Sequence, residues 1–353
     1  MENHINVLAI ASNACNLDCT YCYRNHSAVK TLKFETFEKY MRNMDDFFAP
    51  ETHISVLFHG GEPLLAGYDF YEKAFALLHS FERKIGLGIQ TNLTLLDEKT
   101  VQLFKENRCG FGASLDGDDE INSKTRLIKN SDRSSYQIVV EKINLLKKYN
   151  MSTGIISVIT EYNMEAKRFY RFAKDLDVWS ITPNPIFEFE ESNICTPDLD
   201  ELSNFMIQLF DLWIADENPP KIDFFERVIH TIMGAIPVKK CVFTEDCTKG
   251  MMSIDVDGEV YLCTHWLGRK EYSYGNALTM SFEKLWNSSK RLQLAERGKK
   301  VRASCGECGF WDICHGGCMS HTKHSINEKD YFCKMYRRVF SHIEKTLKET
   351  IGI

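Results

Sequence analysis

The stretch CNLDCTYC, from Cys15 to Cys22, places three cysteines on a short segment near the N-terminus. Three residues separate Cys15 from Cys19, and two separate Cys19 from Cys22. The stretch follows an apolar, β-rich segment at residues 5–11, so we expect it at the carboxyl end of a strand, where active sites of parallel α/β architectures gather. Three thiolates on one loop can bind three irons of a cubane [4Fe–4S] cluster and leave the fourth iron open to a substrate or cofactor.

Strand-like and helix-like segments alternate through the first two thirds of the chain. After the first strand, we expect strands at residues 54–58, 87–91, 111–115, 155–159 and 178–182. We expect helices at residues 34–48, 70–84, 98–106, 135–149, 163–175, 199–213 and 224–233. This alternation predicts right-handed βαβ units and a parallel sheet. Six units are too few for a closed eight-stranded barrel, so we expect an α/β fold with an open, partial (β/α)6 barrel over residues 1–232.

The composition limits the function classes. The chain has 353 residues, a formal net charge of −6 and 13 cysteines. Its mild acidity argues against nucleic-acid and membrane partners, since both favour a basic surface. No apolar run approaches the ~18 residues of a membrane span, and no export signal is visible. We therefore expect a cytoplasmic protein, in which thiols seldom form disulfides and cysteines are first considered as metal ligands.

Eight more cysteines gather in the last third of the chain, whereas Cys109 and Cys195 stand alone. Residues 305–318 read CGECGFWDICHGGC, with gaps of two, five and three residues between cysteines. Zinc is the alternative metal. His26 could complete a zinc site with the three N-terminal cysteines, and the pair Cys305 and Cys308 has zinc-knuckle spacing. Zinc ribbons favour two such pairs, and only one is present. Cys109, at the start of a predicted strand, is interpreted as a small buried hydrophobe.

The N-terminal segment resembles the CxxxCxxC signature of the radical S-adenosylmethionine (radical SAM) superfamily. Further motifs of that family follow at successive predicted strand ends: HGGEP at residues 59–63, QTN at 90–92 and SLDG at 114–117. The resemblance implies that GGEP receives the amine of the methionine moiety, and that Ser114 and Arg126 engage the carboxylate and the ribose. The cofactor-binding residues it implies are Tyr21, Gly60, Gly61, Glu62, Thr91, Asn92, Ser114, Asp116, Arg126 and, after the sixth strand, Pro185.

This resemblance also implies a reaction. Cys15, Cys19 and Cys22 would hold the catalytic cluster. S-adenosylmethionine would be cleaved reductively to methionine and a 5′-deoxyadenosyl radical, which removes a hydrogen atom from an unactivated C–H bond. The cofactor carries this chemistry, and the protein supplies positioning and exclusion of water. We expect an oxidoreductase that works anaerobically and receives electrons from a flavodoxin- or ferredoxin-type donor.

The C-terminal cysteines resemble the SPASM domain, whose pattern is Cx9–15Gx4C, then Cx2Cx5Cx3C, then a final Cys. In the anaerobic sulfatase-maturating branch an eighth cysteine, here Cys241, completes the first auxiliary cluster. By this resemblance one auxiliary [4Fe–4S] cluster is held by Cys241, Cys247, Cys263 and Cys318, and a second by Cys305, Cys308, Cys314 and Cys333. We expect the SPASM domain over residues 233–335, including a β-hairpin that turns at Asp257 and Gly258, and a C-terminal helix within 336–353. The chain would then hold three [4Fe–4S] clusters, or about twelve irons.

One position departs from the sulfatase-maturating branch. That branch typically places an Asp directly after the third auxiliary cysteine as the proposed base, and this chain has Thr264 there, followed by His265. A threonine is a poor base, whereas the imidazole of His265 has a pKa near working pH and could accept the proton. The alternative is that His265 only packs beside Trp266. The absence of the Asp leaves room for a crosslink or thioether as the product.

The sequence thus predicts a radical SAM/SPASM enzyme that modifies a residue of a ribosomally made peptide or protein. Because the first predicted strand begins about five residues into the sequence, we expect no N-terminal peptide-recognition domain, and a leader peptide would be recognised by a separate protein, by the core enzyme, or not at all. Two alternatives stay open: a radical SAM dehydrogenase of a small molecule, and a non-catalytic iron–sulfur protein.

Overall fold

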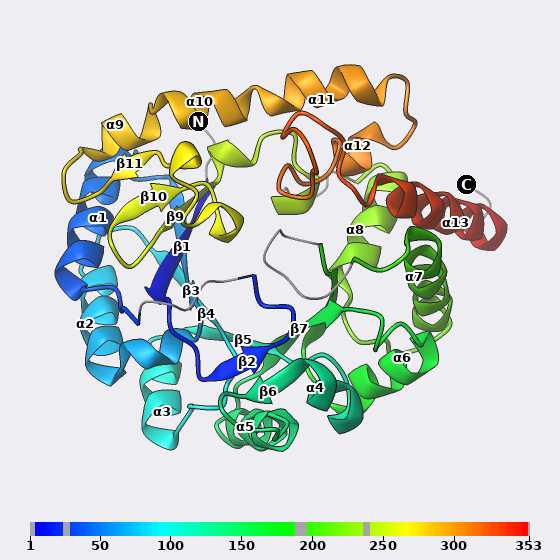
Figure 1. Cartoon of the computed structure of the whole chain (residues 1–353), viewed down its shortest axis with the longest axis horizontal. Helices are drawn as coiled ribbons and strands as arrows, with labels where there is room; N and C mark the ends of the chain where they lie inside the picture. The colour runs from blue at the N-terminus through cyan, green and yellow to red at the C-terminus, as the bar shows by residue number, and fades with distance from the viewer. Residues whose placement is uncertain (1–3, 24–28, 188–195, 236–240, 352–353) are drawn as a thin grey trace.

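Six parallel strands form the framework of the N-terminal part (Figure 1). They are β1 (His4–Ser12), β3 (His53–Gly60), β4 (Ile85–Thr91), β5 (Gly110–Ser114), β7 (Thr153–Ile159) and β8 (Ser180–Pro185), paired in that order. The computed structural model describes residues 4–23, 29–187, 196–235 and 241–351. The predicted α/β fold with a partial barrel is confirmed.

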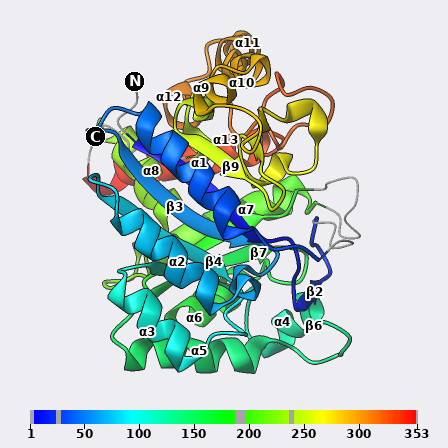
Figure 2. The ribbon, with the colours of Figure 1, turned by 90° about the vertical axis from the view of Figure 1, so that its left-hand side faces the viewer.

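Helices connect these strands and cover the outer face of the curved sheet (Figures 1 and 2). They are α1 (Phe34–Phe47), α2 (Tyr68–His79), α3 (Glu98–Glu106), α4 (Asp119–Thr125), α5 (Tyr136–Lys148), α6 (Ala166–Asp175), α7 (Leu199–Ile214) and α8 (Asp223–Ile232). Two short strands, β2 (Leu17–Cys19) and β6 (Arg126–Ile128), pair antiparallel above the carboxyl ends of the main strands. This small ribbon joins the loop after β1 to the segment after α4.

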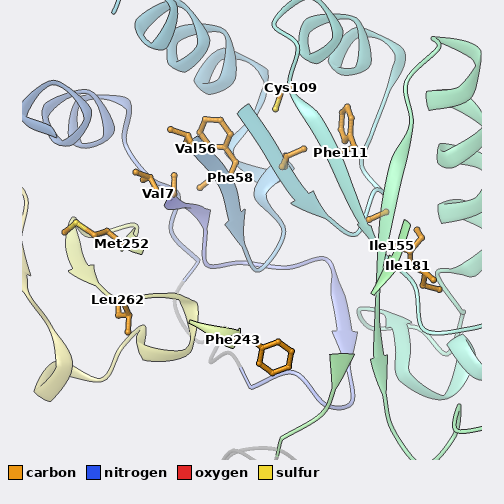
Figure 3. Packing of buried hydrophobic residues seen from close by; sticks show 14 of the residues in the cluster. Val7, Val56, Phe58, Cys109, Phe111, Ile155, Ile181, Phe243, Met252 and Leu262 are labelled. Atoms are coloured by element: carbon orange, nitrogen blue, oxygen red, sulfur yellow. The ribbon is translucent and has the colours of Figure 1, made fainter. Parts of the chain in front are cut away.

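The main sheet continues into the cysteine-rich part. Strand β9 (Met251–Ile254) pairs parallel with β1, and β10 (Glu259–Tyr261) and β11 (Gly275–Asn276) extend the sheet antiparallel. The predicted hairpin between β9 and β10 is confirmed, and Gly258 takes a positive φ of 84° in its turn. One hydrophobic core runs through both parts: Val56 and Phe111 pack in the barrel, while Met252 and Leu262 belong to the same cluster (Figure 3).

Short helices complete the C-terminal part: α9 (Phe282–Trp286), α10 (Ser289–Ala295), α11 (Arg297–Cys305) and α12 (Trp311–Cys314). The long α13 (Cys333–Ile351) then returns to the barrel and packs against α7 and α8. Lys334 and Arg338 of α13 both pair with Asp200 of α7. The predicted domain boundary between residues 232 and 233 coincides with the end of α8. The sheet and the hydrophobic core continue across it, so the division into two domains stays a prediction.

Strand β8 begins and ends later in the sequence than predicted, at Ser180 and Pro185. We expected a strand over 178–182 and a loop after it, whereas β8 runs to Pro185. The Ile181 amide donates to the Lys221 carbonyl, on the side of β8 that faces away from β7. Every second residue of the strand therefore directs its backbone nitrogen to this outer edge of the barrel sheet. Pro183 and Pro185 occupy those positions, where a missing N–H costs no bond to β7.

Two helices also differ at their ends. Helix α2 ends at His79, not residue 84, because Arg83 turns back and donates to carbonyls at the end of α1, including that of Phe48. Helix α6 begins at Ala166, not residue 163, because the Asn163 side chain is used in a turn with Thr160. No described helix is long and apolar enough to cross a membrane. His26 and Cys195 lie outside the described residues.

Candidate functional site

The three N-terminal cysteines lie on the loop after β1, at the carboxyl end of the sheet as predicted. The thiols of Cys15, Cys19 and Cys22 are close enough to interact electrostatically. The Leu17 amide points to the Cys15 sulfur at 3.4 Å, and the Asn92 side-chain amide to the same sulfur at 3.7 Å. Burial raises the pKa of Cys19 to about 12. Metal binding would therefore have to displace protons from thiols on this loop.

Gly60 and Gly61 hold this loop against the sheet. A Cβ on Gly60 would lie 2.0 Å from the Ser12 carbonyl oxygen, and one on Gly61 would lie 2.3 Å from that of Ala14. The Gly61 amide donates to the Ser12 carbonyl at 2.8 Å, and the Glu62 amide donates to that of Ala14 at 2.7 Å. Both residues are predicted cofactor contacts, and the structure adds that they allow the loop after β1 to approach β3.

Gly60→Ala tests this contact. We expect a loss of about 2–5 kcal/mol of stability, because overpacking and a strained backbone each cost about 1–3 kcal/mol, and Gly60 has a φ of 147°. Denaturant unfolding would measure it. Gly110→Ala is the matched control, because its Cβ would meet no atom closer than 3.9 Å. Equal stability of the two variants would contradict the close approach.

Glu62 is fully buried between the loop and the sheet. It accepts bonds from the Thr91 hydroxyl at 2.7 Å, the Asn92 amide at 2.8 Å and the Leu64 amide at 2.9 Å. Burial raises its pKa to about 7, although these three bonds act in the opposite direction. The predicted cofactor residues Thr91 and Asn92 therefore hold Glu62 in place from the end of β4.

A buried ionic cluster lies beneath Cys19. Asp116 has no exposed surface, and its carboxylate accepts bonds from the Tyr21 hydroxyl at 2.7 Å and the Thr125 hydroxyl at 2.8 Å. The Arg126 guanidinium lies 3.1 Å from the same carboxylate and 4.0 Å from the Cys19 sulfur. Burial alone would lower the pKa of Arg126, but Asp116, Tyr21 and Cys19 outweigh it and raise the pKa above its usual value.

This geometry changes the interpretation of one predicted cofactor contact. Both carboxylate oxygens of Asp116 accept hydrogen bonds from protein groups. Oδ2 accepts from the Tyr21 and Thr125 hydroxyls, and Oδ1 accepts from the Val158 amide at 3.0 Å. Asp116 is therefore placed to hold Tyr21 and Arg126 beside the loop that carries the N-terminal cysteines, and its contact with a cofactor stays a prediction. Ser114 lies at the end of β5, where its hydroxyl accepts a 3.1 Å bond from Gln90, and Pro185 ends β8.

His265 packs against the segment that carries the N-terminal cysteines. It lies in the short helical turn Thr264–Trp266 directly after Cys263. Its ring stacks on Tyr23, next to Cys22, with centroids 5.5 Å apart. The His321 ring meets it edge-on at 5.9 Å, and His321 in turn lies 3.2 Å from Asp330. His265 thus joins the two cysteine regions instead of only packing beside Trp266.

The eight C-terminal thiols separate into two groups. Electrostatic interactions between thiols connect Cys241, Cys247, Cys263 and Cys318. A separate group joins Cys305, Cys308, Cys314 and Cys333, which also line one cavity. These are the two ligand sets that the resemblance implies. Cys109 is buried in the barrel core away from both, as predicted (Figure 3).

The donor sets suit cubane clusters. Within the described ranges, no three His, Cys, Asp or Glu side chains converge on a point that could hold a single ion. A cubane spreads its thiolates over different irons, so its ligands need not converge. Three thiols on the N-terminal loop and four in each C-terminal group therefore fit one open and two closed clusters.

Several residues of the site carry no sequence signal. Asn163 donates to the Asp116 carbonyl at 2.8 Å, and Arg297 donates to five carbonyls around the C-terminal thiols. His321 and Asp330 flank Cys318. Each acts through contacts between distant segments, so spacing in the sequence could not reveal them.

Comparisons with known proteins agree with this geometry. A model of the radical SAM superfamily matches residues 10–173, and a model of the SPASM iron–sulfur cluster-binding domain matches 241–309. The chain is 28% identical to a cysteine-type anaerobic sulfatase-maturating enzyme of Clostridium perfringens, over 94% of both chains. It is 29% identical to a serine-type anaerobic sulfatase-maturating enzyme of Bacteroides thetaiotaomicron, over 93% of this chain and 86% of that one.

A solved structure described as native anSMEcpe with bound AdoMet and Cp18Cys peptide superposes with a TM-score of 0.87. The match has 26% sequence identity and covers 99% of each chain. The radical SAM model includes the three N-terminal cysteines, the SPASM model includes the cysteines from Cys241 to Cys308, and the whole-length relatives and this superposition span both cysteine regions. The chain therefore belongs to the radical SAM superfamily and carries a SPASM iron–sulfur cluster-binding domain in its C-terminal part.

Proposed function

We propose that this protein is a radical SAM oxidoreductase that oxidises a residue of a ribosomally made peptide or protein, in the manner of sulfatase-maturating enzymes. The observation that carries the proposal is the placement of one three-thiol loop and two four-thiol groups around a single sheet. The similar structure with a bound Cp18Cys peptide supports a peptide substrate. The position of Thr264 leaves the product open between an oxidised residue, a crosslink and a thioether.

The proposed cofactors are S-adenosylmethionine and three [4Fe–4S] clusters, held by Cys15, Cys19 and Cys22 and by the two C-terminal thiol groups. When bound, they supply removal of a hydrogen atom from an unactivated C–H bond and uptake of an electron. The chain's own contribution is to hold the thiols, to keep Glu62 and Arg126 buried at the strand ends, and to provide a proton acceptor.

A deuterated peptide tests this function. Candidate peptides encoded near the gene would be incubated anaerobically with the reduced protein and S-adenosylmethionine, and analysed by mass spectrometry. We expect deuterium in 5′-deoxyadenosine and a product that has lost two hydrogens. Unlabelled 5′-deoxyadenosine would contradict hydrogen abstraction from the peptide. Conversion of small metabolites alone would favour a small-molecule dehydrogenase, and no cleavage at all would favour a non-catalytic protein.

We propose His265 as the proton acceptor in place of the absent Asp. Its support is its position between Tyr23, beside the N-terminal thiols, and His321, beside Cys318. A proton and an electron must both leave the substrate after hydrogen abstraction, and Cys263 of the first C-terminal thiol group, which would take the electron, lies two residues before His265. A base in this place would remove the proton where the electron leaves.

His265→Ala should separate the two steps. We expect deuterium transfer to 5′-deoxyadenosine to persist, while product formation falls by roughly 10²–10⁴-fold, the usual contribution of a general base. Single-turnover assays of both products would measure it. His324→Ala is the control, because His324 is an exposed histidine of the same domain. Product formation at the wild-type rate in His265→Ala would contradict the assignment.

The remaining partners rest on the sequence. We propose that a flavodoxin- or ferredoxin-type protein donates electrons to the enzyme. We also propose that a leader peptide, if the substrate has one, is recognised by a separate protein or by the core enzyme, and that the protein works in the cytoplasm. A pull-down from anaerobic lysate with the loaded protein, followed by reduction assays with the purified candidates, would test the donor.

A further inference from the structure

Arg297, the first residue of α11, is a cation enclosed by backbone. Its side chain is among the largest fully buried ones, with only 1% of the residue exposed. The guanidinium donates to five carbonyl oxygens at 2.8–3.5 Å: those of His315, Gly316, Gly317, Ile326 and Glu328. All the donors therefore point into one pocket of main-chain oxygens.

This charge has no direct carboxylate partner in the described part of the chain. None of the ion pairs found there includes Arg297; the Asp330 carboxylate acts on it electrostatically, but its oxygens are hydrogen-bonded to the Cys318 and Phe332 amides. Burial lowers the pKa of Arg297 below its usual value. A buried charge without a counter-ion is costly, and carbonyl dipoles compensate only part of that cost. The position therefore favours further negative charge beside that of Asp330.

The thiols supply the candidate source. Arg297 interacts electrostatically with Cys318 and Cys247 of the first C-terminal group and with Cys305 of the second. It thus lies between the two thiol groups. A [4Fe–4S] cluster with four thiolates is anionic overall, because the thiolates outweigh the charge of the iron–sulfide core.

The backbone around Arg297 is shaped for this contact. The link between Cys314 and Cys318 consists of His315, Gly316 and Gly317, which take positive φ values of 49°, 80° and 71°. A Cβ on Gly316 would lie 2.8 Å from Val301, and one on Gly317 would lie 2.3 Å from Asp330. The link therefore bends left-handed over three residues and directs its carbonyls at the guanidinium. It joins a ligand of the second group to a ligand of the first.

We propose that Arg297 is a positioning residue whose positive charge, held between the two auxiliary clusters, sets the reduction potentials of both and ties their ligand loops together. The proposal rests on the proposed function in one respect, that the two thiol groups hold clusters. Positive charge beside an anionic cluster favours its reduced form, so Arg297 would raise both potentials and ease uptake of an electron from the substrate.

Arg297→Met and Arg297→Lys test the charge in the fully reconstituted protein. Met fills a similar volume without charge, whereas Lys keeps the charge with fewer donors. EPR-monitored redox titration and iron analysis would be compared with the wild type. We expect both auxiliary potentials to shift to more negative values in Arg297→Met and to stay near wild type in Arg297→Lys. Loss of auxiliary iron from the Met variant alone would also support the charge.

Arg291→Met is the matched control. Arg291 is another buried arginine of the same domain, which donates to the Thr248 and Trp286 carbonyls but interacts electrostatically with no cysteine. Its replacement should leave the potential of the second auxiliary cluster unchanged. Unchanged potentials in a loaded Arg297→Met, equal shifts in both Arg297 variants, or equal iron loss from both would overturn the proposal. Absence of auxiliary clusters from the wild type would instead refute the proposed function itself.

Discussion

Replacing Cys15, Cys19 and Cys22 together by Ala is expected to abolish cleavage of S-adenosylmethionine and to reduce bound iron from about twelve to about eight per chain. The three thiols are the ligands that the N-terminal loop offers, and the two C-terminal groups do not share them. Anaerobic reconstitution, an iron assay and chromatographic detection of 5′-deoxyadenosine would measure both effects.

Two further variants control this experiment. The pair Cys305→Ala and Cys333→Ala should also leave about eight irons, but cleavage should persist because the N-terminal loop is intact. Cys109→Ala should keep all irons and all cleavage, since its thiol is buried in the barrel core (Figure 3). Residual cleavage by the triple variant, or loss of more than one cluster from it, would refute the separation into independent ligand sets.

Asp116→Ala is expected to destabilise the protein by about 3–5 kcal/mol, because it leaves the buried Arg126 charge without its partner. The same substitution removes acceptors for the Tyr21 and Thr125 hydroxyls and for the Val158 amide. Since Arg126 also contacts the Cys19 sulfur, we expect weaker retention of the N-terminal iron. The midpoint of urea unfolding at an unchanged slope, with iron retention after desalting, would measure these effects.

A surface pair and a double variant sharpen that result. Glu120→Ala removes an exposed partner of Arg168 and Lys124, and it should lower the stability far less than Asp116→Ala does. The double variant Asp116→Leu with Arg126→Met should be more stable than Asp116→Ala, because it removes both buried charges. A small effect of Asp116→Ala, similar to that of Glu120→Ala, would mean that the buried pair does not hold the loop.

Local patterns predicted much of the fold. Periodicity located the six strands and most of the helices between them, because the spacing of apolar residues shows which side of a strand or helix is buried. It missed the short helix α4, Asp119–Thr125. Errors occurred where a long-range contact overrode the local pattern. Prolines in β8 suggested a loop, but their nitrogens face the open edge of the sheet. Helix α2 ended early because Arg83 binds the end of α1 instead of continuing the helix.

The joining of the two parts was not predictable in the same way. The hairpin of β9 and β10 was expected from its turn, yet nothing in its sequence shows that β9 pairs with β1 (Figure 1). The two strands are more than 200 residues apart in the sequence, so their pairing depends on how the barrel between them folds. This pairing brings His265 opposite Tyr23, which makes a single site from two cysteine regions.

By itself, the sequence determined where the cysteines gather, because spacing along the chain is a local property: three lie on one loop and eight in the last third. The division of those eight into two ligand sets came from the resemblance to the SPASM domain. Only the tertiary structure decided which charges lie beneath those thiols. Asp116 and Arg126 meet under Cys19, and Arg297 is enclosed between the C-terminal groups, because segments distant in the chain pack together and exclude water there. Burial strengthens the electrostatic interactions of a charge, and spacing along the chain does not encode burial of this kind.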